Sequence, residues 1–255
     1  SLRILRRFRP DAMLFTGGYV AVPMAVAARI PQPGLRRPQS LSFVPDVEPG
    51  LALKVVARIS DLVAGSTDET QKFFPTNRIV KVTGYPLRPD LVRWDKGAAQ
   101  KVLGLEPGLP TLLVFGGSKG ARTINQALMA ILPELLTRMQ VIHLSGRLDW
   151  EAVQANARLL SAELSGRYHA YAYLHDEMGA ALVAADLAVS RAGASCLGEF
   201  PNFGLPAILV PYPHAWRYQR MNAEYLVQRR AAVLLPDDEL PTKLLPLVLG
   251  LMNDT

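Results

Sequence analysis

The sequence has little cysteine and no long apolar run. Its single cysteine, Cys196, excludes an internal disulfide framework and any zinc site built from several cysteines, which suits a reducing compartment. No apolar stretch approaches the roughly 20 residues that a membrane-spanning helix needs, and the arginine-rich start is not followed by the apolar segment of a secretory signal. Composition therefore favours a globular protein that stays in the cytoplasm.

The positive charge is spread unevenly. Residues 1–87 hold 12 Lys and Arg against 6 Asp and Glu, whereas residues 88–255 hold 16 against 16, so the first third carries the whole net charge of +6. Apolar residues lie among the N-terminal arginines. Such a segment can contact an anionic membrane surface, where each basic residue contributes about 1 kcal/mol, or it can be a solvated helix face. No aromatic stacking pattern accompanies the charge, which argues against a nucleic-acid partner.

Strand-like and helix-like segments alternate along the chain. We expect strands at 12–15, 41–44, 62–64, 79–82, 112–115, 141–144, 168–174, 187–189, 207–211 and 232–235, with helices at 22–29, 51–59, 96–103, 122–136, 148–160, 176–185 and 240–252. This order predicts an α/β fold with parallel sheets covered on both faces, in two doubly wound units. Two prolines and a glycine interrupt the alternation at 83–89, so we predict a domain of residues 1–87 and another of residues 88–255.

Two strand-to-helix junctions carry glycine pairs, at 16–19 and at 116–121. A glycine-rich turn before a helix lets a phosphate approach the backbone N–H groups. The second turn is neither a P-loop nor a dinucleotide fingerprint, because the Gly-Lys-Ser/Thr ending is absent and the glycine spacing differs. We nevertheless predict that it binds a pyrophosphate. For the first turn, a phosphate contact and a merely tight bend both stay open.

The stretch 190–226 places polar residues after two neighbouring strands. Arg191 and Gly193 follow one strand, and Glu199 lies on the next helix. A second strand then ends in a predicted polar loop that carries Gln219. Because the carboxyl ends of parallel strands meet at one edge of a sheet, we expect these residues to converge on a polar, partly anionic ligand.

Asp46 and Glu48 follow the strand at 41–44, where open α/β sheets place their working groups. Asp46 can equally be a cap of the next helix. His143 and His169 fall inside strand patterns, which favours a packing role for both.

Three segments together resemble the MurG family of bacterial peptidoglycan glycosyltransferases. They are TGGYVAVP at 16–23, GGSKGARTINQAL at 116–128, and SRAGASCLGEF with GLPAILVPYPH within 190–214. The resemblance runs over nearly the whole chain and implies a GT-B architecture, two Rossmann-like domains of which the first is incomplete. It also implies inverting transfer of N-acetylglucosamine from UDP-N-acetylglucosamine to an undecaprenyl-pyrophosphoryl-muramyl-pentapeptide lipid, without a cofactor or a required metal. The resemblance further implies a peripheral position at the cytoplasmic face of the membrane, against its anionic surface.

The resemblance also implies roles for single residues of the donor site. Ser118 and its turn match the diphosphate contact, and Arg88 matches an arginine that reaches phosphate. Glu199 matches the carboxylate that accepts the ribose hydroxyls, and the backbone near Leu174 and His175 matches the segment that reads uracil. The implied donor set is Arg88, Gly117, Ser118, Lys119, Gly120, Leu174, His175, Arg191, Gly193, Ala194, Glu199, Gln219 and Asn222.

On the acceptor side the matching residues are Thr16, Gly17, Gly18 and Tyr19. Asp46 is our candidate general base, because Val44 stands where the family has a glutamate, and a histidine in a segment before Ser1 is its rival. The loop Ala215-Trp216 and Tyr218 depart from the family's charged loop and second glutamine. Sugar recognition by Gln219 and Asn222 thus matches the family less well than UDP recognition does. The resemblance also leads us to expect that this chain is a piece of a longer protein.

Three other functions stay open. One is a nucleotide-sugar-binding module without catalysis of its own, and another is a related transferase that acts on a glycolipid. The third is a dinucleotide-binding oxidoreductase, against which the absent fingerprint argues.

Overall fold

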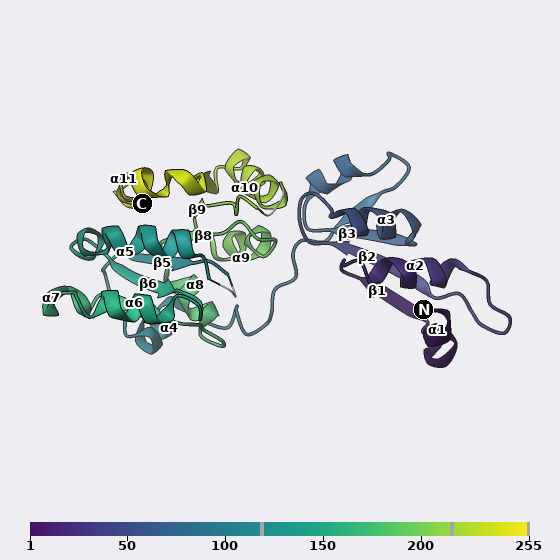
Figure 1. The fold of residues 1–255 in the computed structure, drawn as a ribbon, viewed down its shortest axis with the longest axis horizontal. Helices are drawn as coiled ribbons and strands as arrows, with labels where there is room; N and C mark the ends of the chain where they lie inside the picture. Colours follow the sequence, from purple (N-terminus) through teal and green to yellow (C-terminus); the bar gives the residue numbers. More distant parts are fainter. Residues whose placement is uncertain (118–119, 215–216, 254–255) are drawn as a thin grey trace. The chain divides into compact units, whose positions relative to one another are not determined.

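The computed structural model describes residues 1–117, 120–214 and 217–253. The chain divides into two compact units, Ser1–Pro86 (unit 1) and Leu87–Thr255 (unit 2), and each is described by itself. This division falls one residue before the predicted domain boundary. In both units parallel strands alternate with helices (Figure 1), so the predicted α/β fold class is confirmed.

Unit 1 holds a parallel sheet with the strand order β1-β2-β3-β4. Its strands are β1 (Ala12–Phe15), β2 (Gln39–Val44), β3 (Leu62–Gly65) and β4 (Val80–Val82), and its helices are α1 (Leu2–Phe8), α2 (Ala21–Arg29), α3 (Leu51–Ile59) and the 3-10 helix η1 (Asp68–Phe73). In the register of β1 and β2, Phe15 pairs with Ser42. The ends of β1 and β2, with the loops that follow them, therefore open at the same edge of the sheet.

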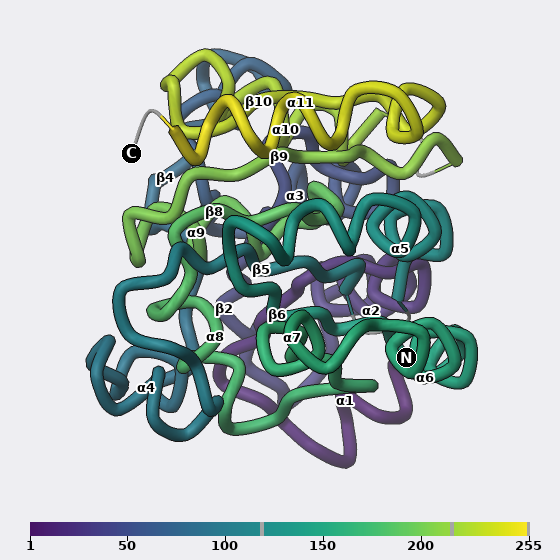
Figure 2. The backbone as a smooth tube through the Cα atoms, turned by 90° about the vertical axis from the view of Figure 1, so that its left-hand side faces the viewer, coloured from purple at the N-terminus to yellow at the C-terminus, as the bar shows by residue number. Residues whose placement is uncertain are grey.

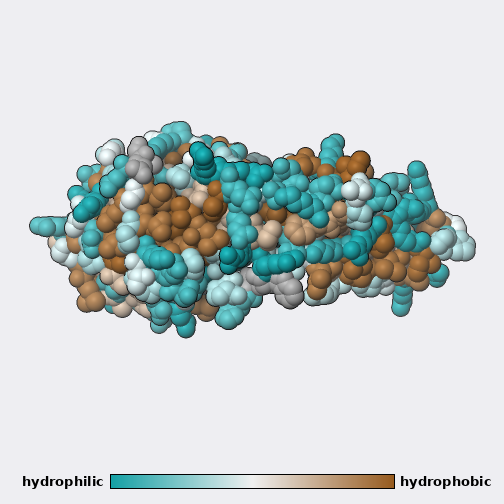
Figure 3. All heavy atoms as spheres, turned by 90° about the horizontal axis from the view of Figure 1, so that it is seen from above, coloured by the Kyte–Doolittle hydropathy of each residue, from teal (hydrophilic) through white to brown (hydrophobic). Residues whose placement is uncertain are grey.

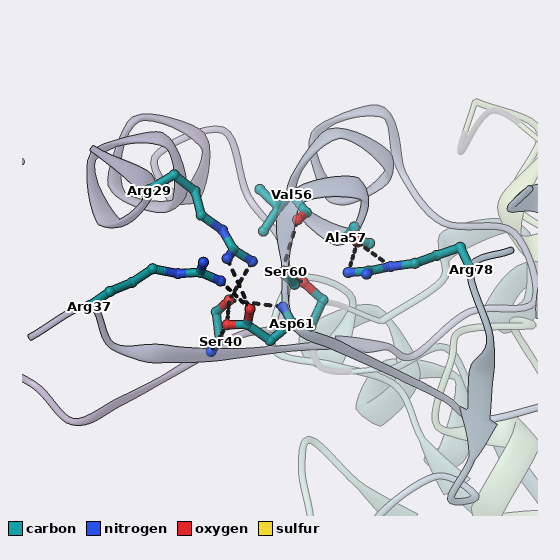
Figure 4. A network of polar contacts seen from close by, with 9 residues as sticks. Arg29, Arg37, Ser40, Val56, Ala57, Ser60, Asp61 and Arg78 are labelled. Atoms are coloured by element: carbon teal, nitrogen blue, oxygen red, sulfur yellow. Dashed lines mark hydrogen bonds and ion pairs between the residues drawn. The ribbon is translucent and has the colours of Figure 1, made fainter. Parts of the chain in front are cut away.

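A polar network fixes the opposite end of β2 and β3 (Figure 4). Asp61 accepts hydrogen bonds from the backbone and side chain of Ser40, from Arg29 over 2.9 Å, and from Arg37. Burial opposes the ionised form of Asp61, but the bonds from Ser40 and the charge of Arg37 outweigh it, so the pKa of this carboxyl lies below its usual value. The network ties the loop after α2 to the sheet.

Unit 2 holds a parallel sheet with the strand order β10-β9-β8-β5-β6-β7. Its strands are β5 (Thr111–Phe115), β6 (Gln140–Leu144), β7 (Tyr168–Tyr171), β8 (Leu187–Ser190), β9 (Ala207–Leu209) and β10 (Ala232–Leu234). Its helices are α4 (Lys96–Leu103), α5 (Arg122–Leu136), α6 (Trp150–Ala157), α7 (Ala162–Ser165), α8 (Met178–Ala184), α9 (Cys196–Phe203), α10 (Tyr218–Gln228), η2 (Asp237–Glu239) and α11 (Leu240–Asn253).

The chain of unit 2 builds its sheet outward from β5 in both directions. Figure 2 shows β10, β9, β8, β5 and β6 one after another down the view, in the order of the sheet. From β5 the chain first adds β6 and β7 on one side and then crosses to β8 on the other. The junction of β5 and β8 is therefore the topological switch point, where open α/β sheets bind their ligands.

Both faces of this sheet are covered, which explains its nearly continuous apolar strands. The main core joins Leu112, Val114 and Val141 of the sheet to helices α5 and α11. On the other face α8 contacts β5 and packs against α4 and α9. Figure 3 shows apolar side chains gathered over α11, where Leu245, Leu247, Leu249 and Leu251 are only partly buried.

The structure differs from the predicted elements in a few places. A helix, α10, begins at Tyr218, so Gln219 lies in a helical turn and not in the predicted polar loop. The seventh strand ends at Tyr171, three residues before the predicted end. Gly50, and not Asp46, is the N-cap residue of α3.

Candidate functional site

The candidate site of unit 2 is a pocket of about 750 Å³ at the switch point. It lies where β5 and β8 end side by side, since Phe115 pairs with Ser190 in the register of the two strands. Its lining comes from the turns after these strands, from the start of α5, from the loop before α6 and from α10. The lining residues are Phe115, Gly116, Gly117, Gly120, Ala121, Arg122, Thr123, Leu148, Asp149, Arg191, Gly193, Ser195, Tyr212 and Gln219. This volume suits a drug-sized ligand.

The turn between β5 and α5 can be made only with glycine at position 120. The φ of Gly120 is +78°, in the left-handed region. A Cβ atom there would also collide with the backbone carbonyl of Ser145. The N–H of Gly120 donates to the carbonyl of Gly117 over 2.9 Å, which closes the turn. Both the backbone conformation and the packing at position 120 thus require glycine.

Helix α5 starts directly after this turn, and its N-cap residue, Ala121, has no capping side chain. Its first N–H groups therefore have no helical acceptor and can bind an anion. Gly117 and Gly120, which are two of the residues predicted to contact the diphosphate, line the pocket. Ser118 and Lys119, the other two predicted residues of this turn, lie outside the described residues.

Arg191 lines the pocket, but its guanidinium is engaged by the protein. It forms an ion pair with Asp237 of η2, donates to the hydroxyl of Thr123 over 2.8 Å and to the carbonyl of Val210 over 3.2 Å. Its side chain is only 10% exposed. Arg191 therefore joins the ends of β8 and β9 to the start of α5 and to η2, and its charge is largely balanced by Asp237.

Glu199 lies in the first turn of α9, near the positive charge of Arg88. Burial raises the pKa of Glu199 above its usual value, while a hydrogen bond with Ser195 and the charge of Arg88 partly lower it. Glu199 is half-buried and Arg88 is exposed. Arg88 pairs with Asp90 over 3.5 Å.

Helix α10 holds the segments that follow β8 and β9 through two amide side chains. The Oε1 atom of Gln219 accepts a hydrogen bond from the backbone N–H of Tyr212 over 2.8 Å. The Nδ2 atom of Asn222 donates to the carbonyl of Ala192 over 3.1 Å, and Asn222 is completely buried. Gln219 thus reaches the pocket, whereas Asn222 lies beneath the turn that follows β8.

The remaining predicted donor residues are spread around the same edge of the sheet. Gly193 lines the pocket, and Ala194 follows it in the same turn. Leu174 is buried, and His175 is exposed and stacks edge-on against Tyr173 with ring centroids 4.7 Å apart. Leu174 and His175 follow β7, the outermost strand on one side of the sheet, and are not among the residues that line the pocket.

The predicted acceptor-side residues lie in unit 1, after β1. Thr16, Gly17, Gly18 and Tyr19 form the connection to α2, and Tyr19 is exposed. A Cβ atom on Gly18 would meet no atom within 4 Å, so this turn is open around the glycine.

The two carboxylates after β2 differ in their surroundings. Glu48 is buried and forms an ion pair with Lys54 over 2.8 Å. Asp46 is half-buried. Glu48 is therefore engaged by Lys54, and Asp46 is the more exposed of the two carboxylates.

Three charged residues of the pocket have no predicted role. Arg122 and Asp149 belong to its lining, and Asp237 holds Arg191. Arg122 could have been found, since it directly follows the predicted phosphate-binding turn. Asp149 and Asp237 carry no comparable local signal, because the folding of the chain brings them to the pocket from separate loops.

Comparison with known families gives a match over most of unit 2. Residues 111–255 match the glycosyltransferase family 28 C-terminal domain. The chain is 45% identical, over 92% of its length, to the UDP-N-acetylglucosamine–N-acetylmuramyl-(pentapeptide) pyrophosphoryl-undecaprenol N-acetylglucosamine transferase of Roseiflexus sp. (strain RS-1). It is 37% identical, over its whole length, to the protein of that name from Listeria monocytogenes serotype 4a. The chain spans 59% of the first relative and 68% of the second.

Solved structures give the same result at the level of the fold. MurG of Acinetobacter baumannii matches 99% of the chain with a TM-score of 0.72 at 25% identity, and 70% of the MurG chain is covered. A UDP-GlcNAc 2-epimerase from Neisseria meningitidis, solved with UDP-GlcNAc bound, matches 97% of the chain and 70% of its own length with a TM-score of 0.67 at 12% identity. The second likeness concerns the fold alone.

Proposed function

Because the chain belongs to glycosyltransferase family 28 and, within it, to the MurG family, we propose that it serves peptidoglycan synthesis. The proposed reaction transfers N-acetylglucosamine from UDP-N-acetylglucosamine to a lipid-linked muramyl-pentapeptide. The observation that carries this proposal is the pocket of unit 2, in which a glycine turn, a helix N-terminus and the turn after β8 meet at the switch point. Since the chain spans 59% of its relative from Roseiflexus, the complete reaction is proposed for the whole protein.

The donor is proposed to bind through its UDP part. The diphosphate lies against the turn 116–120 and the first N–H groups of α5, which suit an anion. Glu199 accepts hydrogen bonds from the two ribose hydroxyls, because an ionised carboxylate has acceptors on both oxygens. The backbone at Leu174 and His175 reads uracil, and Gln219 contacts the sugar. Asn222 supports the sugar site from beneath, through its bond to Ala192.

Transfer with inversion requires a base and a stabilised leaving group. The acceptor hydroxyl attacks the anomeric carbon, and the base removes its proton. Asp46 is the proposed base within this chain. The charge that develops on UDP is stabilised by the backbone N–H groups of the turn and by arginine, and no metal is required in this scheme.

The lipid acceptor places the protein at a membrane, and we propose a peripheral position on its cytoplasmic face. Helix α1 supports this, because Ile4 and Phe8 are exposed between its arginines. Nearby, Arg9 and Arg36 line a small pocket of about 180 Å³. Among the residues described, no helix is long and apolar enough to cross a membrane.

A second candidate is a donor-binding module that needs more chain for catalysis. It is favoured by the distribution of the predicted donor residues, all of which lie in unit 2, together with the partial cover of the relatives. A transfer assay with UDP-N-acetylglucosamine and the lipid-linked acceptor separates the two. Transfer by this chain supports the enzyme. UDP binding without transfer, with transfer restored by an N-terminally extended chain, supports the module, and absence of UDP binding contradicts both.

A further inference from the structure

Arg122 is the first residue of α5, and its side chain stands in the wall of the pocket. The side chain is 70% exposed, and its Nε atom donates to Asp149 over 3.0 Å. Within the described part of the chain, Asp149 is the only partner of this guanidinium. The two Nη atoms therefore have no described acceptor. They form the edge with which an arginine binds a phosphate in two parallel hydrogen bonds.

Asp149 is held in place from its other side. Its Oδ2 atom accepts a hydrogen bond from the Nδ2 atom of Asn125 over 2.9 Å. Asp149 directly precedes α6, yet its side chain makes no capping bond to that helix. Both carboxylate oxygens are thus turned to Arg122 and Asn125, and the orientation of Arg122 depends on that of Asp149.

Asn125 in turn is fixed by a buried network. Its Nδ2 atom also donates to the carbonyl of Ser145 over 2.9 Å, so its Oδ1 atom must face His143 as an acceptor. The Nε2 atom of His143 therefore carries the proton, and the Nδ1 atom accepts from the hydroxyl of Tyr168 over 2.6 Å. Asn125, His143 and Tyr168 are all buried. The network leads from the core to Arg122 and gives each polar atom along the way one defined role.

We propose that Arg122 is a diphosphate-binding residue of the donor site and that Asp149 is its positioning residue. This rests on the proposed function for the identity of the ligand, a nucleoside diphosphate. The geometry distinguishes Arg122 from Arg191, whose guanidinium is engaged by three partners and is 10% exposed. In the same pocket, the guanidinium of Arg191 binds other parts of the protein, whereas that of Arg122 binds the ligand.

The test measures binding of UDP and of inorganic pyrophosphate by titration calorimetry. For Arg122→Ala we expect at least tenfold weaker binding of both ligands, with an unchanged unfolding midpoint because the side chain is exposed. Arg122→Lys keeps the charge without the planar fork and should lose less. UMP, which has one phosphate fewer, should lose less than UDP in the Arg122→Ala variant.

Arg220→Ala is the matched control. Arg220 donates its Nε atom to Glu224 over 2.8 Å and is 69% exposed, so it resembles Arg122 in pairing and exposure, but it does not line this pocket. Its removal changes the charge of unit 2 equally and should leave both affinities within twofold. An Arg122→Ala variant with affinities as close to wild type as this control overturns the proposal.

Asp149→Asn tests the positioning role. Both partners of Asp149 donate, so a side-chain amide can accept from only one of them. We expect three- to tenfold weaker UDP binding while Arg122 itself is intact, and a further change of less than twofold when Asp149→Asn is added to Arg122→Ala. Additive losses overturn the positioning role. Wild-type binding of pyrophosphate without UDP specificity contradicts the proposed function alone, whereas binding of neither overturns both.

Discussion

The two units contain the same local motif, a strand that enters a helix through a glycine pair, in different surroundings. In unit 1 the motif follows β1, the outer strand of the described sheet, and the space around Gly18 is open. In unit 2 it follows β5, which has a strand on each side. The space around Gly117 of this pair is also open, but Gly120, three residues further in the same turn, is packed against Ser145. A pocket needs walls on both sides of the turn. The position of the strand in the sheet, and not the motif, therefore makes the site in unit 2.

The largest expected difference in stability between the units comes from a glycine-to-alanine substitution in each turn. Gly120→Ala should destabilise unit 2 by about 3 kcal/mol or more and abolish UDP binding, because it adds backbone strain and a collision. Gly18→Ala has a similar positive φ of +84° but open space, and should cost about 1 kcal/mol without changing UDP affinity. Urea unfolding followed by circular dichroism, together with calorimetry, measures both. Equal effects of the two substitutions would remove the distinction.

Acid should also affect the stability of the two units differently. Burial lowers the pKa of His143 from 6.5 to about 4. Between these values the unfolded chain binds a proton that the folded chain does not, so the free energy of unfolding of unit 2 falls as the pH drops from 6.5 towards 4, by about 3 kcal/mol. Asp61 of unit 1 has a lowered pKa, so its contribution is present above 3.8 and is lost only in stronger acid.

Tryptophan fluorescence can follow this loss, because Trp94, Trp150 and Trp216 all belong to unit 2. Hydrogen exchange in peptides from β2 reports on unit 1. His143→Gln should remove this contribution. The pH dependence that remains comes from His169, whose pKa burial also lowers, and from Glu199, whose raised pKa acts in the opposite direction. The same pH dependence of unit 2 in the wild type and in His143→Gln would contradict the assigned state of His143.

The carboxylates of the two units should differ in their effect on UDP. Glu199→Ala is expected to weaken UDP binding by roughly 1 to 3 kcal/mol, the cost of leaving polar groups of ribose unpaired. Glu224→Ala removes another half-buried carboxylate from the same unit and serves as control, and Asp46→Ala in unit 1 should leave UDP affinity unchanged. An unchanged affinity in Glu199→Ala, measured by calorimetry, would sink the ribose assignment.

The smallest expected effect concerns the membrane. Phe8→Ser should weaken binding to vesicles of anionic phospholipid by about 1 kcal/mol, because the exposed ring of Phe8 is proposed to enter the lipid surface. Leu159→Ser removes a similarly exposed apolar side chain from unit 2 and should have no effect. Equal losses in co-sedimentation would show that contact with lipid is not specific to unit 1.

The order of strands and helices followed from the sequence because periodic apolar residues specify buried strands and amphipathic helices. The predicted bounds of α3, α4 and α5 agree with the structure to the residue. Helix α10 was missed because it is polar and begins without a capping side chain. The predicted turns after β5 and β8 come together because their strands are neighbours, a consequence of sheet order. The roles of Asp149 and Asp237 depend on contacts between distant segments, which no local pattern contains.

The hydrogen bond between Gln219 and Tyr212 has a consequence for the choice of sugar. The N–H of Tyr212 takes one lone pair of the Oε1 atom of Gln219, whereas the Nε2 group, which can only donate, has no partner among the described residues. In the proposed donor complex, a hydroxyl that contacts this Nε2 group offers a lone pair and sends its own proton elsewhere. Discrimination at this position would follow hydrogen-bond polarity, so that a fluorine in place of the hydroxyl should be tolerated better than a hydrogen.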